Sequence, residues 1–308
     1  MKKAIFFVAV AAICGAAQAT VLRVNNNVGS GAPYSNVSSA INAANEGDTI
    51  MIDQSATNYG SFEVDKPLVI FGPGYFRIGN GITTEGASSA KVDEVTVYEA
   101  AAGTVLRGLE VTNTIQVYAP NVVVNRCYFS GNYGVRVEAS AIRCIIHQNF
   151  FKGDRGITGI SANYTQITNN AFCTYYATIT GINEGYIAYN TFAYMTNGGS
   201  QINNCSNCTI EKNIARKLDN ISSCSYDDNY VVDKWIYTDL TTDLTIKNQK
   251  FTDPDIMAGV TGRGAFSGDD PYVISGIPAG PVITDITVPA SVEQGNTLNV
   301  TIKLGVQK

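Results

Sequence analysis

The sequence predicts an all-β protein, a right-handed parallel β-helix solenoid with an N-terminal capping helix and a short C-terminal β hairpin. Three observations predict this class. Asparagine recurs at positions 149, 170, 190, 213 and 229. Apolar residues keep fixed distances from it. The intervening segments, such as "YGVRVEA" and "RGITGIS", are rich in β-branched residues and interrupted by glycine.

Residues 1–19 have the features of a secretory signal peptide. Two lysines precede an apolar run, and Ala17-Gln18-Ala19 forms an A-x-A cleavage site. The run is too short to span a membrane, and no later stretch is long and apolar enough to do so. We therefore expect an exported protein, secreted or held in the periplasm or at the cell surface after cleavage near Ala19.

Cleavage changes the charge and the cysteine count. Loss of Lys2 and Lys3 takes the formal net charge from −5 to −7 (−5 − 2), which argues against a basic groove for nucleic acid. Loss of Cys14 leaves six of the seven cysteines, an even number that suits disulfide formation in an exported chain.

The segment 20–278 is expected to form the solenoid, opened by a capping helix near 35–46. The apolar residues of this helix recur at i, i+3, i+4 and i+7: Val37, Ala40, Ile41 and Ala44. Ser35 or Asn36 can cap its start and Gly47 its end. A helix across the open end would cover the apolar interior of the first turn.

The repeat fills three apolar columns around the asparagine. Three places before it stand Leu106, Val124, Ile146, Ile167, Ile187, Ile210 and Tyr226. Two places after it stand Val111, Phe129, Phe151, Phe172, Phe192, Ala215 and Val231. Eight places before it stand Ala101, Ala119, Ala141, Ala162, Ile182, Cys205 and Ile221. These columns are expected to line the interior.

The asparagine column suggests a tight bend between two strands. We expect the asparagine to supply the positive φ of this bend, and its side-chain amide to bond to the asparagines above and below. A leucine-rich repeat also combines asparagine with apolar residues, but Leu218 is the only leucine between residues 110 and 230. Residues 279–308 alternate apolar and polar residues around "EQGN" and predict a two-stranded hairpin tail.

The chain resembles the pectin-lyase-like β-helix superfamily in "SSAINAANEGDTIMI" (38–52), "YGSFEVDKPLVIFGPGYF" (59–76) and the asparagine rows. Within it, the chain is similar to bacterial secreted β-helix proteins without assigned activity, which share "GPGYF" and a tail like "GRGAFSGDDPYVISGIP" (262–278). The resemblance covers about residues 20–288. It implies the fold and says little about function.

Many members of this superfamily are polysaccharide lyases or hydrolases, but their catalytic motifs do not carry over. The single histidine, His147, is not in a Gly-His-Gly motif. The weak catalytic candidates are Arg136, Asp154, Arg155 and His147. His147 is expected to point outward beside Thr168, and a lone surface histidine is usually not catalytic. Asp154-Arg155 reads as an acid/base pair or, more simply, as a solvated turn.

Tyrosines crowd two adjacent turns of the repeat. The candidate ligand-binding residues are Tyr175, Tyr176, Tyr186, Tyr189, Tyr194 and Glu184. Exposed aromatic rings stack on sugar faces, so this patch could hold a glycan; alternatively the rings only cover the sheet.

Cys208 and Cys224 both lie five places before their asparagines on successive turns, at a spacing that suits a disulfide. Packed free thiols are the alternative. No metal ligand set is evident, because the Cys205-x-x-Cys208 pair has no second pair or histidine.

Two functions remain open. The first is non-catalytic, adhesin-like binding of a glycan or surface macromolecule. The second is a polysaccharide lyase or glycoside hydrolase that acts on an acidic polysaccharide through an atypical site. No cofactor is expected, and calcium is expected only under the lyase alternative. The partner is expected to be a polysaccharide or cell-surface glycan.

Overall fold

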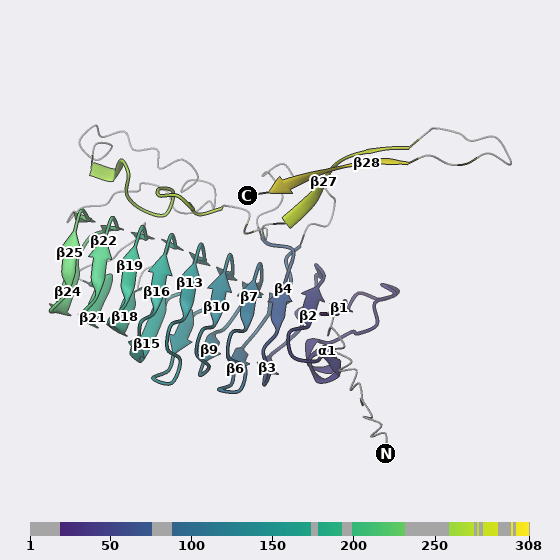
Figure 1. Ribbon diagram of the computed structural model, residues 1–308, viewed down its shortest axis with the longest axis horizontal. Coiled ribbons are helices and arrows are strands. Elements are labelled where there is room, and N and C mark those ends of the chain that lie inside the picture. The colour runs from purple at the N-terminus through teal and green to yellow at the C-terminus, as the bar shows by residue number, and fades with distance from the viewer. Residues whose placement is uncertain are drawn as a thin grey trace, which may run out of the picture.

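The computed structural model describes residues 19–75, 88–173, 178–192, 199–231, 259–273, 276, 280–288, 297 and 300–307. The chain coils through three parallel sheets, and one passage through them is called a rung (Figure 1). The predicted all-β parallel solenoid is confirmed. The expected signal peptide lies outside the described residues except for Ala19.

Sheet A runs along the whole stack. Its ten strands are, in spatial order, β1 (Val21–Val24), β2 (Thr49–Ile52), β4 (Val69–Phe71), β7 (Val105–Arg107), β10 (Val123–Asn125), β13 (Ile145–His147), β16 (Gln166–Thr168), β19 (Tyr186–Ala188), β22 (Thr209–Glu211) and β25 (Ser225–Asp227).

Sheets B and C form the other two walls, with eight strands each. Sheet B contains β3 (Phe62–Val64), β6 (Val95–Val97), β9 (Ile115–Val117), β12 (Val135–Val137), β15 (Ile157–Asn163), β18 (Ile179–Asn183), β21 (Ile202–Ser206) and β24 (Leu218–Ser222). Sheet C contains β5 (Lys91–Val92), β8 (Glu110–Val111), β11 (Tyr128–Phe129), β14 (Phe150–Phe151), β17 (Ala171–Phe172), β20 (Thr191–Phe192), β23 (Ile214–Ala215) and β26 (Tyr230–Val231).

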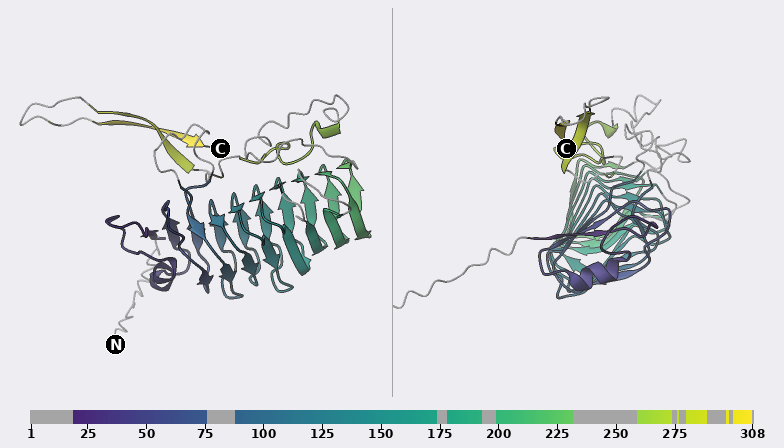
Figure 2. Two further views of the ribbon diagram at one scale, coloured as in Figure 1. Left: turned by 180° about the vertical axis from the view of Figure 1, so that it is seen from behind. Right: turned by 90° about the vertical axis from the view of Figure 1, so that its right-hand side faces the viewer.

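The N-terminal end is capped by the expected helix, but this helix has its C-cap at Ala44 and not at Gly47. Helix α1 (Val37–Ala43) lies across the first rungs and buries Val37, Ala40 and Ile41 (Figure 2). Asn36 is the N-cap, because its side chain accepts a hydrogen bond from the Ser39 N–H. The predicted hairpin tail is also present, with β27 (Gly280–Thr287) antiparallel to β28 (Thr301–Gln307).

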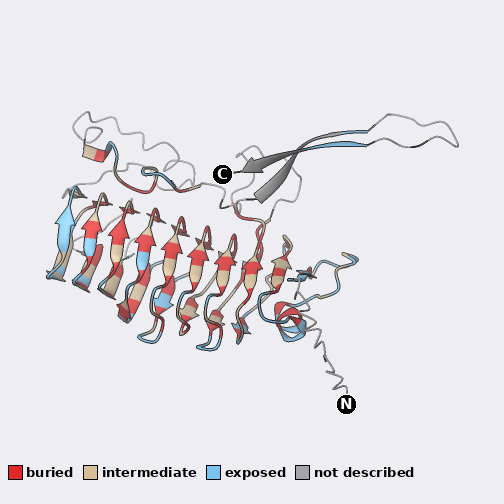
Figure 3. Ribbon diagram, in the orientation of Figure 1, coloured by how far each residue is buried: buried red, intermediate tan, exposed pale blue. Residues whose placement is uncertain are grey.

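The interior follows the predicted columns. Ile146, Ile167 and Ile187 are each at most 1% exposed. The rings of Phe129, Phe151, Phe172 and Phe192 stack with centroids 4.5–4.6 Å apart. Burial falls off at the last rung, where Tyr226 of the isoleucine column is 65% exposed (Figure 3).

The asparagines form the expected ladder. In each rung the side-chain Nδ2 donates to Oδ1 of the next at 2.9–3.0 Å: Asn149 to Asn170, Asn170 to Asn190, Asn190 to Asn213, and Asn213 to Asn229. The expected backbone role is wrong. The left-handed residue of each bend is the one before the asparagine: Gln148, Asn169, Tyr189, Lys212 and Asp228. The buried asparagine instead satisfies polar groups inside the bend.

Candidate functional site

The segment 259–273, here called the strap, packs along the bend between sheets A and C. It runs back from the last rung toward the N-terminal end (Figure 1). Arg263 bonds to Asp228, the Gly264 N–H donates to the Lys212 carbonyl at 2.8 Å, and Asn169 donates to the Ser267 carbonyl at 2.8 Å. The strap therefore contacts the left-handed bend residues of successive rungs.

His147 lies under the strap. It pairs with Thr168 in register, as predicted, but its side chain is only 15% exposed because Asp270 covers it. Its Nδ1 lies 2.8 Å from Thr168 Oγ1, and its Nε2 lies 2.9 Å from Asp270 Oδ2. Burial lowers the pKa of His147 against the opposing effect of Asp270. Because both ring nitrogens of His147 are already hydrogen-bonded, the residue is better placed to hold the strap than to act as a general base. The hydrogen-bonded group of His147, Gln148, Arg126 and Asp270 is called the latch.

Gln148 completes this latch. Its Nε2 donates to Asp270 Oδ1 at 2.8 Å and to the Pro271 carbonyl at 2.6 Å. Its Oε1 accepts a hydrogen bond from Arg126 Nε at 2.7 Å. Burial lowers the pKa of the Arg126 guanidinium, and the Asp270 carboxylate opposes this shift. A chain of charge-assisted bonds thus fixes the strap to the solenoid.

Two segments that lie far apart in the sequence meet next to the latch. Tyr75 of "GPGYF" and Tyr272 of the tail have their hydroxyls 2.8 Å apart in a buried contact. Tyr128 and Phe150 of sheet C pack against Tyr75, at ring-centroid distances of 5.3 and 6.5 Å. Sequence reasoning missed this second core. The adjacent aromatic pairs Tyr128-Phe129 and Phe150-Phe151 signal it, because both faces of such a strand need burial.

The outer face of sheet B carries a cavity of about 310 Å³, here called the groove. It is lined by Glu94, Asn113, Thr114, Gln116, Tyr133, Gly134, Val135, Arg136, Arg155, Gly156 and Thr158. Two of the four catalytic candidates, Arg136 and Arg155, therefore lie together. Asp154 is exposed in the bend before β15 and is not among the lining residues; this exposure agrees with the solvated-turn alternative for Asp154-Arg155.

Each arginine of the groove has its own partner. Arg136 donates from Nε to Glu138, which raises the pKa of the guanidinium. The Arg155 guanidinium carbon lies 5.3 Å from the centroid of the Tyr133 ring, and that ring is 47% exposed. Gln116 donates to Glu94 at 2.7 Å. The groove thus presents a guanidinium, an aromatic ring and amide groups to solvent.

Two glycines set the floor of the groove by close approach. A Cβ on Gly134 would lie 1.9 Å from the Gly156 carbonyl oxygen, and one on Gly156 would lie 2.5 Å from the Thr178 carbonyl oxygen. Any side chain at Gly134 or Gly156 would therefore collide with the backbone of the next rung and force the two rungs apart.

A second cavity, of about 440 Å³, lies toward α1 and shares Glu94 with the groove. Glu63, Asp65 and Thr96 also line it. Nearby, the rings of Tyr98 and Tyr118 stack with centroids 6.4 Å apart, and Tyr98 donates to Glu63 at 2.8 Å. Polar and aromatic groups therefore continue along sheet B.

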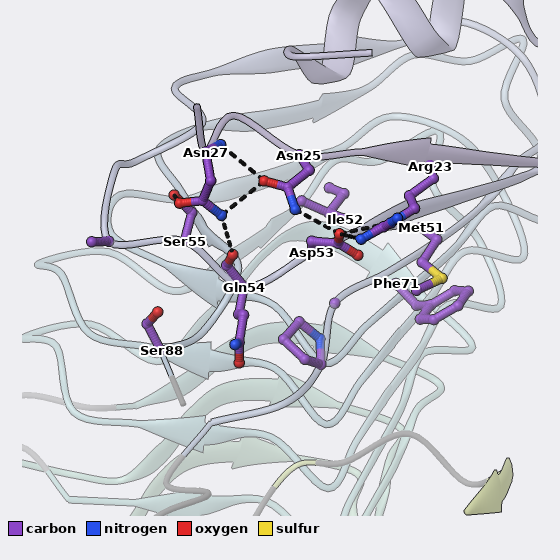
Figure 4. Close-up of a pocket in the computed structure, with 13 residues that line it drawn as sticks. Arg23, Asn25, Asn27, Met51, Ile52, Asp53, Gln54, Ser55, Phe71 and Ser88 are labelled. Carbon is purple, nitrogen blue, oxygen red and sulfur yellow. Dashed lines mark hydrogen bonds and ion pairs between the residues drawn. The ribbon is translucent and has the colours of Figure 1, made fainter. Parts of the chain in front are cut away.

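A third cavity, of about 660 Å³, lies at the N-terminal end beside β1, β2 and β4 (Figure 4). Arg23 and Asn25 both bond to Asp53, at 2.6–2.8 Å, and Asn27 bonds to Asn25 at 2.8 Å. These mutual bonds, drawn as dashed lines in Figure 4, join the loops of the first rungs and help to order them.

The predicted tyrosine patch lies only partly within the described residues, and its two described tyrosines, Tyr186 and Tyr189, both have side-chain partners. Tyr175, Tyr176 and Tyr194 lie outside the described residues. Tyr186 donates to Glu211 at 2.7 Å, and Tyr189 is covered by Gly268 of the strap and accepts a bond from Lys212. Glu184 is exposed at the corner between sheets B and A, where its carboxylate raises the pKa of Tyr164.

Cys208 and Cys224 are free thiols in the structure, which corresponds to the packed-thiol alternative. The Cys208 N–H donates to Cys224 Sγ at 3.4 Å, so the two are stacked as the column predicts. A bridge between them stays a prediction.

Among the described residues, no group of three or more histidine, cysteine or acidic residues is placed to hold a metal ion. No helix in the described ranges is long and apolar enough to cross a membrane.

The chain matches no family model, no curated protein and no solved structure in the comparisons made.

Proposed function

We propose that this protein is exported and binds an acidic polysaccharide chain along the outer face of sheet B, without cleaving it. The observation that carries the proposal is the groove itself. Arg155, Tyr133 and Arg136 meet there on an open polar wall, whereas the outer wall of sheet C is buried under the strap.

The groove chemistry matches a sugar chain with acidic groups. The exposed Tyr133 ring offers a flat apolar face to a pyranose ring, and the guanidinium beside it can pair with a carboxylate or sulfate. The outward column of sheet B is polar on every rung: Glu63, Thr96, Gln116, Arg136, Thr158, Thr180, Asn203 and Asp219. Such a column can follow an extended polymer for several sugar units.

The same residues argue against cleavage. Glycoside hydrolysis uses two carboxyl groups that flank the bond, and Glu94 is the single carboxylate among the groove-lining residues. A lyase needs a base, and Glu138 keeps the Arg136 guanidinium protonated. Arg136 is therefore better suited to hold an anion than to take a proton.

Affinity electrophoresis through gels that contain polygalacturonate, alginate or neutral dextran tests the proposal. We expect retardation in the acidic gels only. Tyr133→Ala and Arg155→Ala should each weaken binding about tenfold, the equivalent of about 1.4 kcal/mol. The matched control is Arg143→Ala, because Arg143 lies over the Tyr164 ring at 5.8 Å in a similar exposed pair outside the groove.

Retardation that is lost equally in the groove and control variants would contradict a groove site. Retardation in dextran alone would contradict the acidic ligand. Release of unsaturated or reducing ends from these polymers would show that the site is catalytic.

A further inference from the structure

Three cysteines meet at the C-terminal end of the stack. Cys205 lies in β21, Cys208 directly precedes β22, and Cys224 directly precedes β25 on the next rung. Cys205 and Cys208 are 1% and 2% exposed, and Cys224 is partly exposed. The proposed polysaccharide site uses none of them.

Cys208 and Cys224 are neighbours across rungs. Thr209 pairs with Ser225, and the Ser225 N–H donates to the Cys208 carbonyl at 2.9 Å. The Cys208 N–H in turn donates to Cys224 Sγ at 3.4 Å. The Cys224 sulfur therefore lies directly over the Cys208 backbone.

Cys205 and Cys208 are neighbours within one rung. Asn207 between them has φ 54°, and after this bend both side chains lie buried in the interior. Ile182 and Gly185 hold the same two positions one rung earlier, and they show how close these positions are. A Cβ on Gly185, below Cys208, would lie 2.5 Å from Ile182 Cγ2. The sulfur of Cys224 also lies 3.5 Å from the Cys205 carbonyl oxygen.

We infer that Cys205, Cys208 and Cys224 form one thiol–disulfide exchange site, in which Cys208 bonds either to Cys205 within its rung or to Cys224 across rungs. The two bridges exclude each other because both use the Cys208 sulfur. The oxidant is a low-molecular-weight disulfide, and the more exposed Cys224 is the point of entry.

The chemistry balances in three displacements. The Cys224 thiolate attacks the external disulfide, which forms a mixed disulfide and releases one thiol. The Cys208 thiolate attacks the Cys224 sulfur, forms the bridge across rungs and releases the second thiol. The Cys205 thiolate can then attack the Cys208 sulfur, which forms the bridge within the rung and frees the Cys224 thiol. Overall, two protein thiols lose two electrons and two protons to the external disulfide.

The surroundings favour Cys208 as the shared atom. The neighbouring Cys205 side chain and the Gly185 N–H, which lies 3.3 Å from Cys208 Sγ, both lower the pKa of Cys208. Burial raises the pKa of Cys224. Since the thiolate is the nucleophile, Cys208 is the thiol best prepared to resolve a mixed disulfide.

Peptide mapping tests the inference. The full-length protein is reduced, oxidised with glutathione disulfide, alkylated and digested with trypsin, which cleaves on either side of residues 156–212 and 218–234. A bridge across rungs joins these two peptides. A bridge within the rung leaves peptide 156–212 closed on itself and Cys224 alkylated. Circular dichroism verifies that each variant folds.

We expect Cys205→Ser to give only the bridge across rungs, Cys224→Ser only the bridge within the rung, and Cys208→Ser neither. Cys144→Ser is the matched control, since Cys144 is a buried thiol of the same column on an earlier rung. It should leave both bridges intact. Three alkylated thiols in the oxidised wild-type protein would overturn the inference. So would a Cys205–Cys224 bridge that forms as readily in Cys208→Ser as any bridge does in the wild type.

Discussion

Two walls of the same solenoid have opposite outer surfaces. The outward column of sheet C reads Lys91, Glu110, Tyr128, Phe150, Ala171, Thr191, Ile214 and Tyr230, and its five residues from Tyr128 to Ile214 are buried under the strap and Tyr75. No residue of the equivalent column of sheet B, from Glu63 to Asp219, is buried. Both inner columns are apolar. The repeat therefore determines the apolar interior of every wall. The outward residues determine which wall is covered by the strap and which wall stays exposed and can bind a ligand.

The largest expected effect comes from the covered wall. Phe150 is 2% exposed and packs against Tyr128 and Tyr272 at ring-centroid distances of 5.5 and 6.4 Å. Phe150→Ala should lower the free energy of unfolding by about 3–5 kcal/mol, as expected for a buried aromatic ring. Urea unfolding measures this loss. The control on the open wall, Thr158→Ala, should change it by less than about 0.5 kcal/mol, and equal losses would abolish the contrast.

The next largest loss of stability is expected at two adjacent residues, Asn170 in the interior and Asn169 under the strap. Asn170→Ala removes ladder bonds on both sides and leaves buried groups unpaired, so it should cost about 2–3 kcal/mol. Asn169→Gly keeps the left-handed bend but removes the bonds to the Ala265 and Ser267 carbonyls, and should cost about 1 kcal/mol. Thermal unfolding of both variants checks the order. The reverse order would mean that the strap, rather than the ladder, holds the bend.

A smaller effect concerns pH at the latch, where Asp270, Arg126, Thr168 and Gln148 surround His147. The pKa of His147 is lowered in the folded state, so the unfolded chain binds a proton first as the pH falls below about 6.5. Stability should be full above that pH and decline below it, until His147 is also protonated in the folded state.

Unfolding at pH values between about 7.5 and 5.5 measures this dependence. His147→Gln should be less sensitive to pH than the wild type over this range. An identical decline in both proteins would assign the effect to other groups.

The smallest effect on stability is expected in the groove. Tyr133→Ala removes a ring that is 47% exposed, so the free energy of unfolding should change by less than about 0.5 kcal/mol. Calorimetric scans measure this directly. A large destabilisation would show that the ring serves packing, and the tenfold loss of binding proposed above could then not be assigned to direct ligand contact.

The sequence predicts the interior of the solenoid better than its outer surfaces. The isoleucine, phenylalanine and asparagine columns were predictable because each rung repeats the same contacts with its neighbours, as Ile146, Ile167 and Asn170 do. The left-handed position was assigned one residue too late. A bend needs both a residue with positive φ and a polar group inside it, and the asparagine column supplies the second.

The strap was not predictable from the repeat. Its contacts join residues far apart in the sequence, such as His147 and Asp270, and have no periodicity. The groove is predicted in part, since Arg136 and Arg155 are candidates from the sequence, but Tyr133 is not, because it belongs to none of the repeating columns.

Hydroxyl-radical footprinting of the tyrosines, read by mass spectrometry, tests the contrast between the two walls most directly. We predict rapid oxidation of Tyr133, which is 47% exposed, and protection of Tyr128 and Tyr272, which are 8% and 6% exposed. Saturating acidic polysaccharide should protect Tyr133 and leave the oxidation of Tyr128 and Tyr272 unchanged. If Tyr128 reacts as fast as Tyr133 in the free protein, the strap does not cover sheet C, and the assignment of one covered and one binding wall is wrong.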